Sequence, residues 1–237
     1  MNNLPVEARL SATVVLLRDT EQGLEALLLR RNPKLKFAAG SWVFPGGAVD
    51  QDELERTPTQ YQALEVAAIR EVQEECGVVV GKQSLVHFCN WTTPEAEKKR
   101  FSTWFFVARV DDPNAEITID NGEIHEYQWL GPEQALALHS QGDLNLMPPA
   151  FLTLLLLSHY QTVEAACLDL AQRTNFSVTP KLAVTNGQMA AIYPGDAEYG
   201  TGQPSSSGPQ HRTLFTDMGM KYIHSGADVS VPPMDRP

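Results

Sequence analysis

The most informative stretch of the sequence is Arg70-Glu71-Val72-Gln73-Glu74-Glu75-Cys76-Gly77-Val78, in which a charged run is followed by a glycine. An α-helix turns by about 100° per residue, so Glu71, Glu74 and Glu75 would share one helix face. Like charges at these spacings destabilise an isolated helix by about 0.2–0.5 kcal/mol per pair. The pattern therefore indicates either an acidic face exposed to solvent or a site for a hard cation such as Mg²⁺ or Mn²⁺, which prefers carboxylate oxygens.

The residues around this run favour the cation site. Phe44-Pro45-Gly46-Gly47 stands ahead of it, with Gly47 24 residues before Glu71, and Gly77 suits the end of a helix. Thr57 is predicted as the helix N-cap and Pro58 as its first residue. We therefore expect one long helix that ends at Gly77 and carries the three glutamates.

Outward from this helix, the apolar pattern predicts further strands and helices. The runs 11–17 and 24–30 are β-like and are separated by a turn-rich stretch, which predicts a hairpin. The other expected strands lie at 41–44, 78–80, 84–90, 101–110 and 123–130. The other expected helices lie at 132–139 and 149–172.

With these elements in place, the chain resembles the Nudix hydrolase superfamily. The Nudix box reads Gly, five residues, Glu, seven residues, Arg-Glu, an aliphatic residue, any residue, Glu-Glu, any residue, Gly and an aliphatic residue. The chain matches it at Gly47, Glu53, Arg70, Glu71, Val72, Glu74, Glu75, Gly77 and Val78. Sixteen residues instead of seven separate Glu53 from Arg70, an insertion of nine that fits a lengthened polar loop at 50–59. The insertion leaves open whether Glu53 plays its usual part.

The resemblance implies an α/β fold: a Nudix-type α/β/α sandwich with a mixed sheet, followed by a C-terminal extension. It also implies that Glu71, Glu74 and Glu75, with the backbone carbonyl of Gly47, hold Mg²⁺ or Mn²⁺. Arg70 would hold the glutamates in place by ion pairing, and Glu74 is the expected general base. The alternative bases are carboxylates outside the box, Glu123 and Glu126, although each is more simply interpreted as a surface acid.

The expected reaction is cleavage of a phosphate anhydride in a nucleoside-diphosphate-linked metabolite. Segments 28–31, 91–94, 100–106 and 126–136 are similar to a branch that includes coenzyme A diphosphatases, so coenzyme A or its esters are the favoured substrates. ADP-ribose and reduced dinucleotides come next. A ligand-sensing domain without catalysis and a hydrolase of damaged nucleoside triphosphates are the remaining alternatives. Arg30, Arg31 and Phe44 are the predicted substrate-binding residues.

Composition excludes some other partners. The formal net charge is −11 and the pI is about 4.9, so a nucleic-acid polymer is a poor partner. The apolar run 151–157 is far shorter than the roughly 20 residues of a membrane span. Three widely spaced cysteines indicate reduced thiols rather than disulfides, and the first residues do not look like a signal peptide. We therefore expect a cytoplasmic protein that does not bind membranes.

Two parts are expected along the chain. Residues 1–163 would form the hydrolase domain, and residues 164–237 an extension that packs on its core. A stretch rich in glycine and serine predicts a flexible loop near 200–208. Homodimers are common in the superfamily, so the resemblance suggests a homodimer here.

Overall fold

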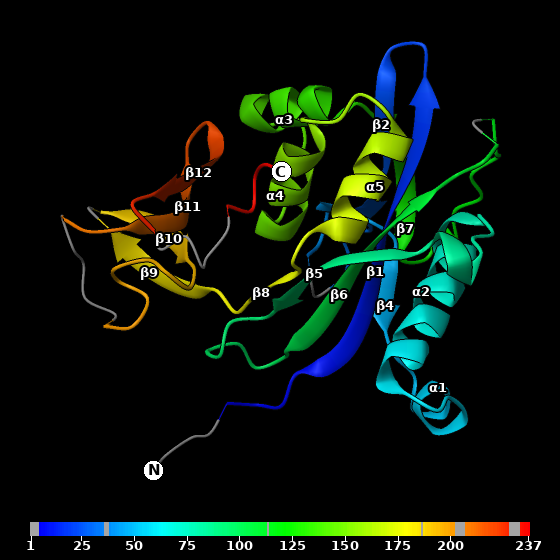
Figure 1. Cartoon of the computed structure of the whole chain (residues 1–237), viewed down its shortest axis with the longest axis horizontal. Coiled ribbons are helices and arrows are strands. Elements are labelled where there is room, and N and C mark those ends of the chain that lie inside the picture. The colour runs from blue at the N-terminus through cyan, green and yellow to red at the C-terminus, as the bar shows by residue number, and fades with distance from the viewer. Residues whose placement is uncertain (1–4, 36–37, 113, 186, 202–206, 228–232) are drawn as a thin grey trace.

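The chain folds into a large mixed sheet between two layers of helices, followed by a smaller antiparallel sheet (Figure 1). The computed structural model describes residues 5–35, 38–112, 114–185, 187–201, 207–227 and 233–237. The predicted α/β/α sandwich with a mixed sheet is confirmed.

The large sheet has the order β3-β2-β1-β6-β5-β8, with β4 paired to β1 and β7 paired to β2. Its strands are β1 (Arg9–Thr20), β2 (Gly23–Arg31), β3 (Trp42–Val43), β4 (Gly46–Ala48), β5 (Val86–Thr92), β6 (Phe101–Arg109), β7 (Ile124–Leu130) and β8 (Phe176–Val178). The β1–β6 and β5–β8 pairs are parallel and the other pairs are antiparallel. The hairpin predicted from the first two β-like runs is present as β1 and β2.

Strand β1 explains the layered packing, because successive side chains of a strand point to opposite faces of the sheet. Val14 and Leu16 are fully buried in the apolar cluster that includes α2 (Gln60–Cys76). Val15 and Leu17 are fully buried in the cluster on the other face, which includes α4 (Pro148–Leu157) and α5 (Val163–Gln172). Each such burial contributes about 1.5–3 kcal/mol, so both faces of the sheet need a helical cover.

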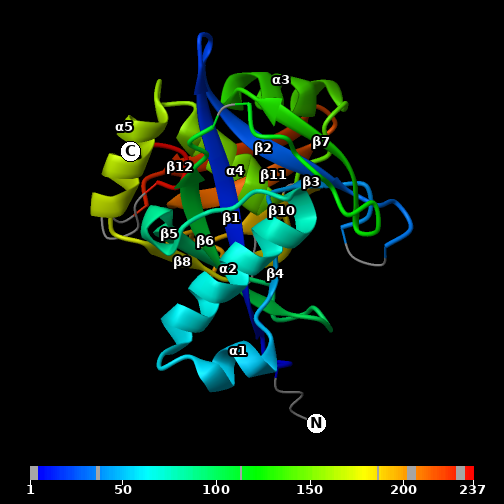
Figure 2. The same ribbon diagram turned by 90° about the vertical axis from the view of Figure 1, so that its right-hand side faces the viewer.

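The predicted loop at 50–59 is partly wrong, because its first half forms the short helix α1 (Gln51–Arg56), which lies at the start of α2 (Figure 2). Thr59, rather than Thr57, caps α2 by accepting from the backbone N–H of Gln62. The Thr57 hydroxyl instead donates to the Glu53 carbonyl at the end of α1. Proline disfavours helical backbone in the residue before it, so the Thr57-Pro58 pair separates the two helices.

The end of α2 is as expected. Gly77 has φ +72° and ψ 1°, the left-handed conformation that favours glycine, and its N–H bonds the Gln73 carbonyl. The strand predicted at 78–80 is not formed. Val78 and Val80 are buried against α2 while Val79 is 81% exposed, so this apolar run anchors the chain without joining a sheet.

The single helix predicted at 149–172 is wrong. The chain forms α4 and α5 with a break between them, and the Thr162 side chain caps α5 by accepting from the N–H of Ala165. Helix α3 (Pro132–Gln141) lies where the sequence predicts a helix.

The smaller sheet comes from the C-terminal part of the chain and has the order β12-β11-β10-β9. Its strands are β9 (Lys181–Thr185), β10 (Gln188–Ile192), β11 (Gln210–Thr216) and β12 (Gly219–Ser225). Strand β12 contacts α3 and α4, and Tyr193 and Met234 join the apolar cluster of Val15. Both α5 and β8 continue the assembly around the large sheet, so the division at residue 163 stays a prediction.

The predicted loop near 200–208 lies largely outside the described residues. In the ranges that are described, no helix combines the length and apolar character needed to cross a bilayer.

Candidate active site

Helix α2 brings the three predicted glutamates to one cavity. Their exposure differs: the side chain of Glu74 is 58% exposed, that of Glu71 is 15% exposed, and Glu75 is 6% exposed. The helix therefore presents one carboxylate to solvent and holds two against the protein.

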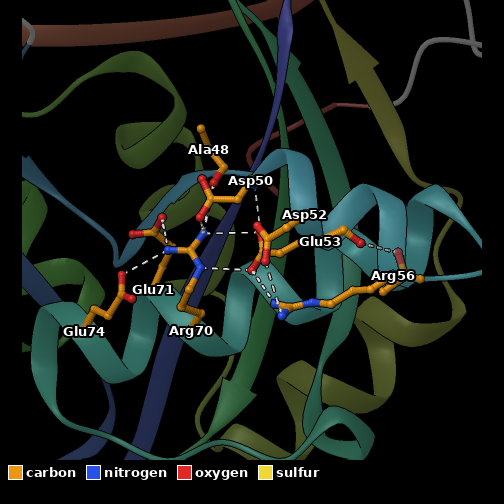
Figure 3. Close-up of polar contacts among 9 residues, drawn as sticks. Ala48, Asp50, Asp52, Glu53, Arg56, Arg70, Glu71 and Glu74 are labelled. Carbon is orange, nitrogen blue, oxygen red and sulfur yellow. Dashed lines mark hydrogen bonds and ion pairs between the residues drawn. The ribbon is translucent and has the colours of Figure 1, made fainter.

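Arg70 connects these carboxylates to the rest of the fold (Figure 3). Its Nη1 donates to Glu71 Oε1 at 2.8 Å and to Glu74 Oε2 at 3.0 Å. Its Nε donates to Glu53 Oε1 at 2.9 Å, and its Nη2 donates to the carbonyl of Ala48 on β4 at 3.1 Å. Burial alone would lower the pKa of the Arg70 guanidinium, but its hydrogen bonds and ion pairs with Glu53 and Glu71 outweigh burial and raise that pKa. Arg70 is thus a permanent cation that fixes the glutamates by ion pairing.

Glu53 holds Arg70 from the opposite side. It is 1% exposed, and its second carboxylate oxygen accepts from the backbone N–H of Asp50 at 2.8 Å, at the start of α1. The insertion follows Glu53, so it lengthens the path to Arg70 without separating the two side chains. Glu53 therefore occupies a positioning role, which the interrupted spacing in the sequence left open.

Strand β4 lies against the glutamates and requires glycine. The N–H of Gly46 donates to Glu75 Oε2 at 2.9 Å, which fixes the buried carboxylate. A Cβ added to Gly47 would overlap the carboxylate of Glu71, with 2.7 Å to its Oε2. The two glycines thus allow the backbone to approach the acidic face directly.

Burial sets the electrostatics of the site. It raises the pKa of Glu75 to about 8, with the nearby Glu71 acting in the same direction and the Gly46 N–H acting against it. Burial also raises the pKa of Glu71, although Arg70 opposes this. Desolvated carboxylates that repel each other are stabilised by a cation, which is the condition expected at a metal site.

The donor chemistry of the site fits a divalent cation. Glu71, Glu74 and Glu75 offer hard oxygen ligands on one cavity wall, with the backbone of Gly47 directly opposite Glu71. Arg70 bonds Glu71 and Glu74, so these two carboxylates point toward the guanidinium. In the described ranges, no three side chains of aspartate, glutamate, histidine or cysteine are close enough together to hold an ion. Glu74 is the most exposed of the three and so has the most freedom to turn toward an ion.

The cavity has a volume of about 980 Å³ and contains two of the three predicted substrate-binding residues, Arg31 and Phe44, in its lining. Arg31 pairs with Glu123 at 3.2 Å, and Glu123 also lines the cavity. Arg30 instead pairs with Glu126 at 2.9 Å, and its guanidinium lies 6.0 Å from the ring centre of Trp42. Of the two alternative bases, Glu123 therefore faces the cavity with the glutamates, whereas Glu126 is bound to Arg30.

Sequence reasoning missed the contribution of the C-terminal part to this cavity. Leu182, Phe215 and Met220 of the small sheet line the same cavity as the glutamates of α2. The strands that carry these residues show only weak apolar alternation, so no local pattern in the sequence indicates that the residues line a cavity. The role of Glu53 had a local signal, because Asp50 and Glu53 have the three-residue spacing of a capping box.

A family model described as the NUDIX domain matches residues 7–149. Putative nudix hydrolase 7 of Caenorhabditis elegans is 25% identical over 228 residues, which is 81% of this chain and 74% of that protein. The acyl-coenzyme A diphosphatase NUDT19 of Xenopus laevis is 25% identical over 118 residues, covering 48% of this chain and 29% of that protein.

A solved structure shares the fold. The crystal structure of a NUDIX hydrolase from Alicyclobacillus acidocaldarius superposes with a TM-score of 0.60 at 22% identity, covering 69% of this chain and 96% of that chain.

Proposed function

Because this chain belongs to the Nudix family and is a pyrophosphohydrolase, we propose that it cleaves the diphosphate of a nucleoside-diphosphate-linked metabolite, with coenzyme A or its esters as preferred substrates. The observation that carries the proposal is the cavity of about 980 Å³ in which Glu71, Glu74 and Glu75 share one wall. This volume is near the upper end of the roughly 300–1,000 Å³ of small-molecule sites, so it suits a substrate larger than a bare nucleotide. The similarity to an acyl-coenzyme A diphosphatase over part of the chain supports the choice of substrate.

Enzymes of this family generally use divalent cations, and we propose Mg²⁺ or Mn²⁺ bound by Glu71, Glu74, Glu75 and the carbonyl of Gly47. When bound, the cation would neutralise charge on the diphosphate and acidify a water molecule. Arg70 keeps the helix face in register with β4 through its bond to the Ala48 carbonyl.

In this proposal Glu74 is the general base that accepts the proton of the attacking water. Its side chain is the most exposed of the three glutamates, so it can reach a water molecule in the cavity. Arg31 lies in the lining and can donate to a phosphate oxygen once it exchanges Glu123 for the substrate. Phe44 is 4% exposed and offers an apolar contact at the same cavity.

A hydrolysis screen tests the proposal. Coenzyme A, acyl-coenzyme A, ADP-ribose, NADH and nucleoside triphosphates would be incubated with Mg²⁺, with Mn²⁺ and with chelator. We expect cation-dependent cleavage of coenzyme A or its esters to two phosphorylated products, each with one phosphate from the broken bond. Release of pyrophosphate from a triphosphate would contradict the proposed substrate class, and preference for ADP-ribose or NADH would replace coenzyme A.

Variants separate catalysis from binding. Glu74→Gln should abolish turnover while the folded state is retained, and the matched control is Glu55→Gln, an exposed residue of α1 that bonds Gln51. Substrate binding by wild-type protein without cleavage under every metal condition would show a ligand-sensing domain instead of an enzyme.

A further inference from the structure

The cavity that contains the glutamates continues to the C-terminal sheet. Its lining joins Glu71, Glu74 and Glu75 of α2 to residues of β9, β10, β11 and β12. The charged wall and the wall made by the small sheet therefore line one cavity, although they come from segments more than 100 residues apart in the chain.

The register of the small sheet explains why its cavity-facing side is apolar. Leu182 pairs with Ala191, and Phe215 pairs with Met220, and directly opposed residues of antiparallel strands lie on one face of a sheet. Ala191 belongs to the apolar core, while Phe215 and Met220 pack against it from their partly buried positions. The same four residues line the cavity.

Part of this apolar face is exposed to solvent. Leu182, Val184 and Met189 are 52%, 57% and 47% exposed, and Val184 pairs with Met189 on the face of Leu182. Exposed apolar surface carries a hydration penalty that an apolar ligand group can remove. Leu146, Met147 and Pro148, at the start of α4, supply further apolar surface to the same cavity.

The wall is held in place by specific bonds. The N–H of Met220 donates to Nε2 of His139 at 3.0 Å, and Nδ1 of His139 donates to the carbonyl of Leu144 at 2.8 Å. His139 is 8% exposed and lies on α3, so it attaches the β11–β12 hairpin to the hydrolase core. A surface fixed in this way can bind a ligand without first being ordered.

We propose that the C-terminal sheet, through Leu182, Phe215 and Met220, binds an apolar chain carried by the substrate and makes the enzyme selective for diphosphates that bear such a chain. The inference rests on the proposed function, since the glutamate wall takes the diphosphate. One substituent of the diphosphate then extends along the apolar face, and the length of this substituent determines how much apolar surface is buried.

The test compares two substrates that differ only in an apolar chain, coenzyme A and decanoyl-coenzyme A, below the micelle concentration of the thioester. We expect the wild-type protein to favour decanoyl-coenzyme A in kcat/KM by about tenfold or more. Leu182→Ser should reduce this ratio about fivefold, because it removes apolar surface from the wall. Leu182→Met keeps an apolar side chain and should keep the wild-type ratio. The control is Met218→Ser, at a residue that is 71% exposed on the turn between β11 and β12 and should leave the ratio within about twofold of the wild-type value.

A second measurement does not depend on turnover. Calorimetric titration of the wild-type protein with each compound in chelator should give the same preference, and Leu182→Ser should reduce it. A preference that is absent, or that Leu182→Ser leaves unchanged, would overturn the role of the sheet. If neither compound is hydrolysed under any metal condition but the preference in binding is present and sensitive to Leu182→Ser, the proposed function fails and the apolar wall stands.

Discussion

Arg70 on α2 donates to Glu53 on α1 at 2.9 Å, joining two helices across the insertion that interrupts the glutamate motif. The pair places a buried carboxylate behind the guanidinium that holds Glu71 and Glu74. The arrangement of the glutamates on α2 thus depends on Glu53, a residue outside the lining of the cavity.

We predict that Glu53→Gln lowers the free energy of unfolding by about 1–3 kcal/mol, because Arg70 loses a charged hydrogen-bond acceptor. Turnover should fall about 10–100-fold, as is usual when the support of a metal ligand is removed. Chemical denaturation and steady-state kinetics measure the two effects. The control is Asp52→Asn, which breaks an exposed pair with Arg56 and should change stability by at most about 0.5 kcal/mol. Equal effects of the two variants would contradict the positioning role of Glu53.

Gly47→Ala should remove most activity while the protein remains folded. The added Cβ would overlap the Glu71 carboxylate, so either β4 or the carboxylate must move. Displacement by about 1 Å in such a site can reduce turnover 100-fold. Kinetics would be compared with those of Gly200→Ala, where an added Cβ has no neighbour within 4 Å among the described residues. Normal turnover by Gly47→Ala would show that the close approach of β4 does not matter to the reaction.

The buried ion pairs of Arg212 should stabilise the small sheet. Its side chain is 2% exposed and bonds the buried carboxylates of Asp196 at 2.6 Å and Glu198 at 2.9 Å. Arg212→Leu would leave two buried carboxylates without their cation, which should lower the free energy of unfolding by about 3–5 kcal/mol. Lys221→Gln, on the exposed side of β12, is the control and should stay within about 0.5 kcal/mol. Denaturation curves that coincide for wild type and Arg212→Leu would refute this prediction.

Because of His211, the stability of the small sheet should decrease at acidic pH. Burial lowers the pKa of His211, whose Nδ1 donates to the Pro194 carbonyl at 2.6 Å, while its buried Nε2 has no partner among the described residues. Well above a pH of about 6.5 the imidazole is neutral in both the folded and the unfolded state and has no effect on stability. As the pH falls below that value, the unfolded chain binds the proton more readily, so the free energy of unfolding falls by at most about 1.4 kcal/mol per pH unit.

The measurement is denaturation of wild type and His211→Asn between pH 7.5 and pH 5.5, in steps of about half a unit. Asparagine can still donate to the Pro194 carbonyl but does not titrate, so its stability should decline less on acidification. His125→Asn, at an exposed position, is the control and should keep the wild-type slope. A wild-type slope in His211→Asn would assign the acid response to other groups.

Local patterns predicted much of the large sheet and the glutamate helix. The apolar runs of β1 and β2 are nearly continuous because both faces of these strands are covered by helices. Gly77 marks the end of α2 by its left-handed backbone. The strand predicted at 78–80 failed because strand formation needs a neighbouring strand, which a run of valines does not reveal.

The site was only partly predictable for the same reason. Glu71, Glu74 and Glu75 are fixed on one face by helix geometry alone, so their common cavity follows from the sequence. The contact of Leu182 and Met220 with that cavity depends on how the small sheet docks through His139, which is a relationship between distant segments. No periodicity within either segment carries that information.

The long parallel pairing of β1 with β6 has a consequence for synthesis of the chain. The hydroxyls of Ser11 and Thr103, which are 92 residues apart, hydrogen-bond at 2.7 Å, so β1 must wait for β6 before its second edge is covered. At ordinary translation rates this delay is roughly 5–20 s. During that interval the nascent chain exposes an unpaired strand edge rich in valine and leucine, and such an edge can pair with a strand of another chain.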